Sequence, residues 1–95
     1  MNLKKTGIAG TFESSDVFVE AVPSDDTLDI QLNSTVASRF GKHIRSLVMD
    51  IAKEMKVSKG LIKIQDKGAL DCTISARVKT AILRATDSDY DWEKK

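Results

Sequence analysis

The sequence has little of the chemistry on which small catalytic domains depend. Its 95 residues include one cysteine, Cys72, and one histidine, His43. A single cysteine excludes an internal disulfide framework and a thiolate zinc site, and a single histidine removes most catalytic metal sites. The short motifs of phosphate-binding loops, zinc proteases and serine hydrolases are missing as well. We therefore expect no metal site and no catalytic residue in this chain.

Long apolar segments and targeting signals are also absent. No apolar run approaches the ~20 residues of a membrane-spanning helix, and no apolar segment follows Lys4 and Lys5 as in a secretory signal. The chain has three Phe, one Tyr and one Trp, and its formal net charge is +1. Nucleic-acid-binding modules normally carry more stacking rings and more positive charge. We expect a cytoplasmic protein with no membrane and no nucleic-acid partner.

The composition fits one small globular domain over residues 1–95. Hydrophobic residues make up 41% and charged residues 31% of the chain, which is typical of a soluble folded protein. The charges are unevenly distributed. Residues 1–33 hold two basic and six acidic residues, residues 34–85 eleven and four, and residues 86–95 two and four. Such a division can orient the molecule against a charged partner, although ordinary solvated helix faces are the simpler interpretation.

Alternating apolar and polar residues predict four strands, at residues 7–13, 16–22, 27–32 and 61–65. Ser14 and Ser15 predict a hairpin connection between the first two, although the Gly or Asn of the tightest turns is missing. The only proline, Pro23, opens a Pro-Ser-Asp-Asp segment that predicts a turn before the third strand.

The period changes at Ser34, where Asn33 or Ser34 can cap a helix. Apolar residues then recur every three or four positions as far as Met55, and again between Ala69 and Ala85. The element order β-β-β-α-β-α predicts an α+β fold. Its expected form is a two-layer sandwich, in which a mainly antiparallel four-stranded sheet carries both helices on one face.

Several polar positions have a structural interpretation that we favour over a chemical one. His43 lies on the polar flank of the first predicted helix, which indicates a solvated side chain. Cys72 begins the second predicted helix, whose dipole can lower a thiol pKa, but a buried or half-buried structural cysteine is favoured. Lys67 and Gly68 lead to Asp71 at a helix start, which can receive an anion, but a plain turn is favoured.

The glycines at the start and the aromatic residues of the tail also need an interpretation. Gly7 and Gly10 spell the GxxG of KH domains, but they precede a strand. Close backbone approach explains them better. In the acidic tail of residues 86–95, Tyr90 and Trp92 are the only tyrosine and tryptophan. The tail is predicted either to be disordered or to dock on a partner through these two rings.

Two stretches of the sequence resemble the citrate lyase acyl carrier proteins, the gamma subunits of that complex. Residues 9–17 (AGTFESSDV) resemble the N-terminal motif of the family. Residues 66–72 (DKGALDC), with Ala76 and Arg77 after them, resemble its second motif. The resemblance extends from about Gly7 to the tail at similar spacing. Phe12 stands where leucine is common, and Ser15 where glycine is often found.

The resemblance implies that this chain is a carrier and not itself a catalyst. It implies that Ser14, with Ser15 as the alternative, carries 2'-(5''-phosphoribosyl)-3'-dephospho-CoA through a phosphodiester. The thiol of this arm would hold acetyl and citryl thioesters while citrate is cleaved to oxaloacetate and acetate. The implied partners are the alpha and beta subunits of citrate lyase and the phosphoribosyl-dephospho-CoA transferase that attaches the arm.

Two other functions remain open at this point. One is a small α+β nucleic-acid-binding module that uses the basic helices. The other is an assembly subunit that carries no cofactor, because the hydroxyls of Ser14 and Ser15 do not by themselves indicate a modification.

Overall fold

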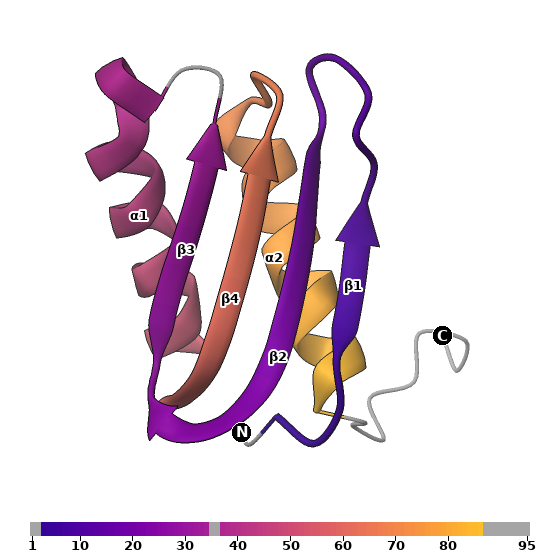
Figure 1. The fold of residues 1–95 in the computed structure, drawn as a ribbon, viewed down its shortest axis with the longest axis vertical. Coiled ribbons are helices and arrows are strands. Elements are labelled where there is room, and N and C mark those ends of the chain that lie inside the picture. The colour runs from indigo at the N-terminus through magenta and orange to yellow at the C-terminus, as the bar shows by residue number, and fades with distance from the viewer. Residues whose placement is uncertain (1–2, 35–36, 87–95) are drawn as a thin grey trace.

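The structure of the protein is a computed structural model that describes residues 3–34 and 37–86, with the side chains of residues 37–40 left aside. Four strands and two helices follow one another in the predicted order (Figure 1). Their bounds are β1 Gly7–Gly10, β2 Val17–Thr27, β3 Asp29–Ser34, α1 Ala37–Glu54, β4 Lys59–Asp66 and α2 Asp71–Ala85. The predicted docking residues Tyr90 and Trp92 lie outside the described residues.

The four strands form one sheet in the order β1-β2-β4-β3. The pairs β1–β2 and β2–β4 are antiparallel, whereas β3 and β4 are parallel. The predicted α+β fold is therefore confirmed, and its sheet is mixed. The parallel pair arises because α1 carries the chain from the end of β3 back to the opposite end of the sheet before β4 begins.

The predicted turn at Pro23 is wrong. β2 continues to Thr27, with a break in its register between Val22 and Thr27, and Pro23 has no partner on β4. Such an irregular stretch tolerates proline, because no ladder hydrogen bond needs its missing N–H. The connection from β2 to β3 must also cross the end of β4, which lies between them, so a long curved strand replaces a tight turn (Figure 1).

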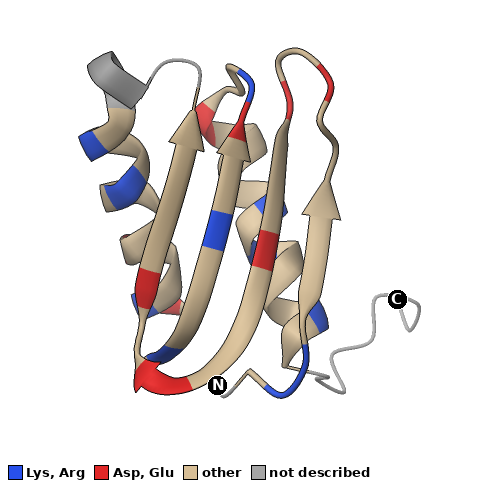
Figure 2. Ribbon diagram, in the orientation of Figure 1, with Lys and Arg blue, Asp and Glu red and all other residues tan. Residues whose placement is uncertain are grey.

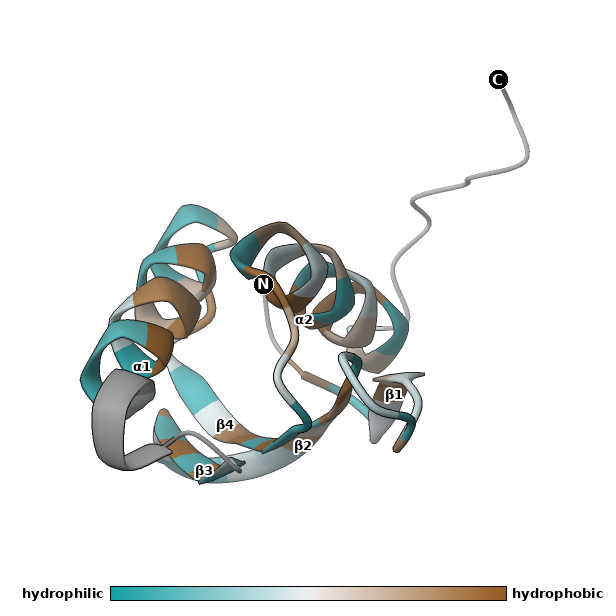
Figure 3. Cartoon of the chain, turned by 90° about the horizontal axis from the view of Figure 1, so that it is seen from above, coloured by the Kyte–Doolittle hydropathy of each residue, from teal (hydrophilic) through white to brown (hydrophobic). Residues whose placement is uncertain are grey.

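Both helices cover the same face of the sheet, as predicted (Figure 3). α2 packs on β1 and β2, and α1 packs on β3 and on α2. The alternation of each strand places every second residue toward the helices, and these residues are mostly apolar. This core consists mainly of small and β-branched residues: Ala9, Val17, Val19, Ala21, Ile30, Ile44, Val48, Ile51, Ala52, Val57, Ile62, Ile64, Ile74, Val78, Ala81, Ile82 and Ala85.

Gly7 brings β1 against α2, which confirms the close approach expected of the first glycines. A Cβ atom at this position would overlap the carbonyl oxygen of Ala81 and the amide nitrogen of Ala85. The chain before β1 is also attached there, because the amides of Lys4 and Lys5 donate to the carbonyl of Ala85 at 2.8 and 3.0 Å. The start of β1 is thereby held against the C-terminal end of α2.

No described helix is both long enough and apolar enough to pass through a lipid bilayer.

Candidate functional site

Three segments that are distant in sequence meet at one end of the sheet (Figure 1). The parallel strands β3 and β4 both end there, with Ser34 opposite Asp66, and the connection from β1 to β2 turns at the same end, with Val17 opposite Asp66. We call residues 11–16 the serine loop and residues 66–69 the Asp66 turn. The two motifs of the family resemblance thus lie side by side, and the first of them contains the serine loop.

The serine loop contains a hydrogen-bonded β-turn with Ser14 and Ser15 at its two central positions. The amide of Asp16 donates to the carbonyl of Glu13 at 3.1 Å, which closes the turn. Ser15 has a φ of +65°, in the left-handed region that this turn position normally fills with glycine or asparagine. Both serines are exposed, as the hairpin prediction requires.

Backbone hydrogen bonds fix this turn to the Asp66 turn. The amide of Ser15 donates to the carbonyl of Lys67 at 2.8 Å, and the amide of Lys67 donates to the carbonyl of Asp16 at 2.9 Å. These reciprocal bonds continue the β2–β4 pairing beyond the last ladder residues. The exposed Ser14 hydroxyl consequently stands on a loop whose backbone is anchored within two residues of it.

The carboxylate of Asp16 is the polar centre of the serine loop. Its Oδ2 accepts a hydrogen bond from Thr11 Oγ1 at 2.5 Å, and its Oδ1 accepts one from the amide of Val17 at 2.7 Å. Arg77 of α2 reaches both carboxylate oxygens at 3.4 Å. The Thr11 hydroxyl first, and then the Val17 amide and the Arg77 charge, hold the pKa of Asp16 below its ordinary value.

Asp66 organises the neighbouring turn from inside. The residue is only 2% exposed. Its Oδ2 accepts a hydrogen bond from Ser34 Oγ at 2.7 Å, and its Oδ1 accepts one from the amide of Ala69 at 2.8 Å. The bond from the Ala69 amide keeps Ala69 in the turn. α2 therefore begins at Asp71 and not at Ala69 as predicted. The same carboxylate joins the ends of β3, β4 and α2.

His43 is exposed, as predicted, but it also has a partner. Its Nε2 lies 2.6 Å from Oδ2 of Asp71, in the first turn of α2. The pair stands beside an open cavity of about 460 Å³ between the two helices, which Ile44, Leu70 and Ile74 help to line. The pair therefore joins the two helices at the surface, and surface ion pairs of this kind usually add at most about 1 kcal/mol.

Cys72 corrects another prediction, because its thiol is free and exposed. The buried stripe of α2 begins at Ile74 and continues at Val78. Cys72 precedes Ile74 by two residues, or about 200° around the helix, and so faces away from the core. A buried or half-buried structural role is therefore excluded.

Basic residues lie along both helices (Figure 2), and the side chains of two arginines bind the sheet. Arg45 of α1 donates to the carbonyl of Ile30 on edge strand β3 at 2.8 Å, and Arg84 of α2 donates to the carbonyl of Ile8 on edge strand β1 at 2.7 Å. These bonds satisfy carbonyls at the two open edges of the sheet. The positive charge of the second half is thus partly structural. In the described part of the chain, no group of three His, Cys, Asp or Glu side chains is placed to hold a metal ion.

The sequence indicated the two serines but not the side-chain contacts that hold their loop in place. Asp16 and Arg77 are 61 positions apart, and Ser34 and Asp66 are 32 apart. No periodicity or local spacing links residues at such distances. The one signal in the sequence was that Asp16, Asp66 and Arg77 all fall within the two stretches that carry the family resemblance.

Comparison with known proteins shows the family to which this chain belongs. Residues 4–85 match the family model of the acyl carrier described as the malonate decarboxylase delta subunit (MdcD). The citrate lyase acyl carrier protein of Pectobacterium atrosepticum is 50% identical over 99% of this chain and 99% of its own length. That of Haemophilus ducreyi is 50% identical over 99% of this chain and 98% of its own length.

A solved structure shares the fold. A chain in the crystal structure of a Pseudomonas malonate decarboxylase hetero-tetramer in complex with malonate superposes with a TM-score of 0.55 at 18% identity. The match covers 86% of this chain and 89% of that chain.

The family match and the α+β sandwich place the chain in a class of small acyl carrier proteins. The chain is a member of the acyl carrier family of the malonate decarboxylase delta subunit, and its full-length relatives within it are citrate lyase acyl carrier proteins.

Proposed function

We propose that this protein is the acyl carrier subunit of a citrate lyase and that Ser14 is its attachment residue. The observation that carries the proposal is the position of Ser14. Its hydroxyl is exposed at the tip of a turn whose neighbours on both sides are fixed by hydrogen bonds. The full-length likeness to citrate lyase acyl carrier proteins supports the choice of complex.

The conformation of the turn favours Ser14 over Ser15. Ser15 occupies the position with positive φ, and its amide is bonded to Lys67. Glycine would satisfy both requirements of this position, so a hydroxyl there has no structural task. Ser14 occupies the first central position of the turn, where an ordinary φ allows any side chain. A side chain at this position can carry a large group without disturbing the hydrogen bonds below it.

The residues around Ser14 fit attachment of 2'-(5''-phosphoribosyl)-3'-dephospho-CoA through a phosphodiester. When bound, this group supplies a terminal thiol that carries acetyl and citryl as thioesters. The contacts among Thr11, Asp16 and Arg77 hold the loop to which the arm would be attached. A tether of this kind keeps its cargo near partner sites at an effective concentration of about millimolar. Such a carrier needs no general base or metal ion of its own.

The proposed partners are the catalytic alpha and beta subunits in the cytoplasm, together with the transferase that modifies Ser14. The related fold occurs in a hetero-tetramer, which supports a role inside a multi-subunit enzyme. The sheet face opposite the helices is not covered by any described part of this chain (Figure 3). It leaves room for such a partner next to the serine loop.

The test compares Ser14→Ala with Ser15→Gly in cells that hold the transferase and the other subunits. We expect intact mass spectrometry to find the arm on the wild type and on Ser15→Gly, and not on Ser14→Ala. Lyase activity should be found only with the proteins that carry the arm. Both variants should fold, because an exposed Ser14 makes no contact that alanine removes and glycine suits the φ of Ser15.

Three outcomes would contradict the proposal. An arm on Ser14→Ala that disappears in Ser15→Ala would move the attachment to Ser15. An active complex whose wild-type carrier has no added mass would indicate a cofactor-free assembly subunit. Salt-dependent binding of the unmodified chain to RNA, with no lyase partner, would favour a nucleic-acid-binding module.

A further inference from the structure

An aromatic pair stands at the base of the serine loop, on the sheet face that the helices leave open. The rings of Phe12 and Phe18 stack with centroids 4.5 Å apart and planes inclined by 27°. Phe18 lies in β2 between Val17 and Val19, which are both fully buried toward the helices. Its side chain therefore projects from the opposite face of the sheet. The pair lies beside the loop that presents Ser14.

Gly10 positions this stack through its backbone. It is the β1 residue directly opposite Phe18, and a Cβ atom on it would overlap the carbonyl oxygen of Val17. Its φ of +97° then turns the chain out of β1, and two residues later Phe12 covers Phe18. One face of the Phe12 ring packs on Phe18, yet 56% of Phe12 stays exposed. The other face of the ring is accessible to a planar ligand.

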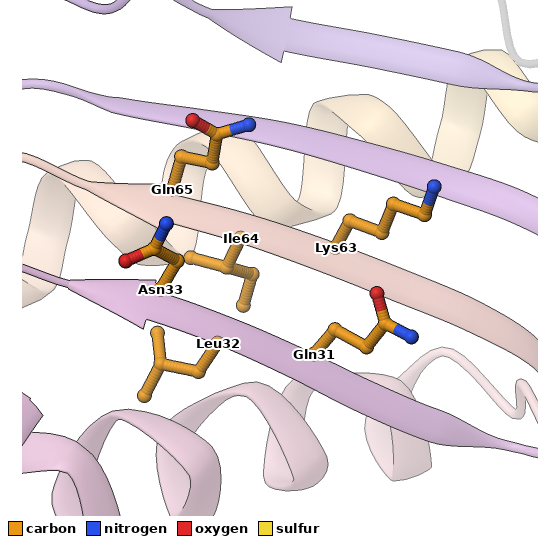
Figure 4. A pocket seen from close by; sticks show the side chains of 6 residues that line it. All are labelled: Gln31, Leu32, Asn33, Lys63, Ile64 and Gln65. Carbon is orange, nitrogen blue, oxygen red and sulfur yellow. The ribbon is translucent and has the colours of Figure 1, made fainter.

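The neighbouring strands β3 and β4 offer no such surface on the open face, although Gln65 of β4 pairs directly with Phe18. Around a shallow groove of about 320 Å³, polar side chains project from β3 and β4 (Figure 4). They are Gln31, Asn33, Lys63 and Gln65. Among the side chains that the structure describes, Phe12 and Phe18 are the only phenylalanine, tyrosine or tryptophan rings. A planar group near Ser14 therefore has one flat apolar partner on this face.

We propose that the exposed face of Phe12 binds the adenine ring of the prosthetic group. The inference rests on the proposed attachment to Ser14. In 2'-(5''-phosphoribosyl)-3'-dephospho-CoA, a phosphate and two ribose rings separate the serine oxygen from the base, whereas the thiol lies at the far end. The Cα atoms of Phe12 and Ser14, two residues apart, are separated by at most about 7 Å. The base is therefore within reach of the ring, and any base can stack on an aromatic side chain.

This contact divides the arm into a held part and a mobile part. The stacked base restrains the anchored end, and the pantetheine part beyond it remains free to enter partner active sites. A leucine at position 12 would have no planar face. Adenine stacking is thus a property that Phe12 gives to this chain.

The cavity between the helices is the competing location for the base. It lies at the same end of the molecule, and Leu70, which is 72% exposed, lines it. A substitution at Leu70 therefore serves as the matched control, since it also removes an exposed apolar side chain near the serine loop.

The experiment uses the modified protein, with the arm on each variant first verified by intact mass. Proton NMR then follows H2 and H8 of the adenine in wild type, Phe12→Leu and Leu70→Ala. Base–aromatic stacking gives roughly a fivefold or greater preference for the stacked state. We therefore expect both protons upfield of their positions in free dephospho-CoA, with nuclear Overhauser contacts to the Phe12 ring. Phe12→Leu should return them to the free positions, and Leu70→Ala should leave them unchanged.

Each other outcome has a distinct meaning. Adenine protons at the free positions in modified wild-type protein, without contacts to Phe12, would overturn the stacking while the attachment stands. Shifts that Leu70→Ala abolishes and Phe12→Leu preserves would place the base in the cavity and overturn it too. If Phe12→Leu cannot be modified, the contacts in the wild type decide alone. A wild-type carrier with no arm in an active complex would overturn the attachment and the stacking together.

Discussion

Asp16 connects the serine loop to the second helix through a single carboxylate. It accepts hydrogen bonds from Thr11 and from its neighbour Val17, and it faces the guanidinium of Arg77. Each of these contacts favours the charged form, and together they lower the pKa of Asp16. A lowered pKa means that the folded state binds this proton less tightly than the unfolded state. The resulting stability is complete above the ordinary aspartate pKa and is lost as pH falls through the lower folded value.

Thr11→Val should raise the pKa of Asp16 toward about 3.9, the ordinary value for aspartate. The hydroxyl of Thr11 is the largest cause of the lowered pKa, and valine keeps its shape without the donor. The contribution of Asp16 to stability should then be smaller than in the wild type, and its loss on acidification should be complete at a higher pH, because it starts at the unchanged unfolded-state pKa and ends at the raised folded-state pKa. A carbon NMR titration of the Asp16 carboxyl measures this directly.

Two further variants control this prediction. Thr11→Ser keeps the hydroxyl and should keep the low pKa. Arg77→Gln should also raise the pKa, because it removes the guanidinium charge that lies 3.4 Å from the carboxylate. A Thr11→Val protein whose Asp16 titrates as in the wild type would show that the hydrogen bond is not the cause.

The backbone conformation at Ser15 could not be predicted from the residue types of the loop. The pair Ser14-Ser15 correctly indicated a hairpin connection, but β1 ends at Gly10 and not at Glu13 as predicted, so the connection spans residues 11–16. Neither serine revealed which of the two would adopt a positive φ. The structure assigns that φ to Ser15 because its amide must point toward the carbonyl of Lys67. The contact that decides the turn comes from a segment about fifty residues further along the chain.

At the scale of elements, the Asp66 turn fastens the ends of β3, β4 and α2 to one another. The buried carboxylate of Asp66 satisfies Ser34 on β3 and the amide of Ala69 before α2. The backbone of the next residue, Lys67, is bonded to the serine loop. The position of the loop is consequently tied to the start of α2 through a few short hydrogen bonds.

Asp66→Ala should lower the free energy of unfolding by about 1–3 kcal/mol, because it leaves buried donors without an acceptor. Amide hydrogen exchange should speed up at Ala69 and Ser15, where the turn is fastened. Chemical denaturation and exchange mass spectrometry measure the two effects. Asp71→Ala removes an exposed carboxylate from the same turn region and should cost at most about 1 kcal/mol. Equal losses in the two variants would mean that the burial of Asp66 is unimportant.

At the scale of the whole molecule, the sandwich depends on the contact between β1 and α2. β1 has only four residues, so the sheet hydrogen bonds of this edge strand are few. Gly7 allows its backbone to approach α2, and Arg84 binds the carbonyl of Ile8 from the helix. The serine loop begins where β1 ends, so the attachment of β1 also positions Ser14.

Gly7→Ala should destabilise the fold by about 1–3 kcal/mol or more, because the new Cβ atom would overlap the backbone of α2. The amides of Lys4 and Lys5, which bond to Ala85, should exchange faster with solvent as β1 moves away. Thr6→Ala, at the exposed neighbouring position, is the control and should unfold as the wild type does. A Gly7→Ala protein with unchanged denaturation would mean that the approach is not as close as described.

The sequence by itself determined the elements and the candidate serine. Period-two and helical patterns depend on neighbours a few residues apart, and these are the distances over which a strand or helix sets which face is buried. The α+β class, the two helices on one face and the exposed serines followed from them, and the family followed from the motifs at residues 9–17 and 66–72.

Only the tertiary structure decided the strand order, the length of β2 and the contacts that hold the serine loop in place. Each depends on a contact between segments far apart in sequence: β4 inserts between β2 and β3, Arg77 reaches Asp16, and Asp66 reaches Ser34. Hydrogen bonds and packing at such separations leave no periodic trace in the chain. They exist only once the sheet brings the ends of its strands together.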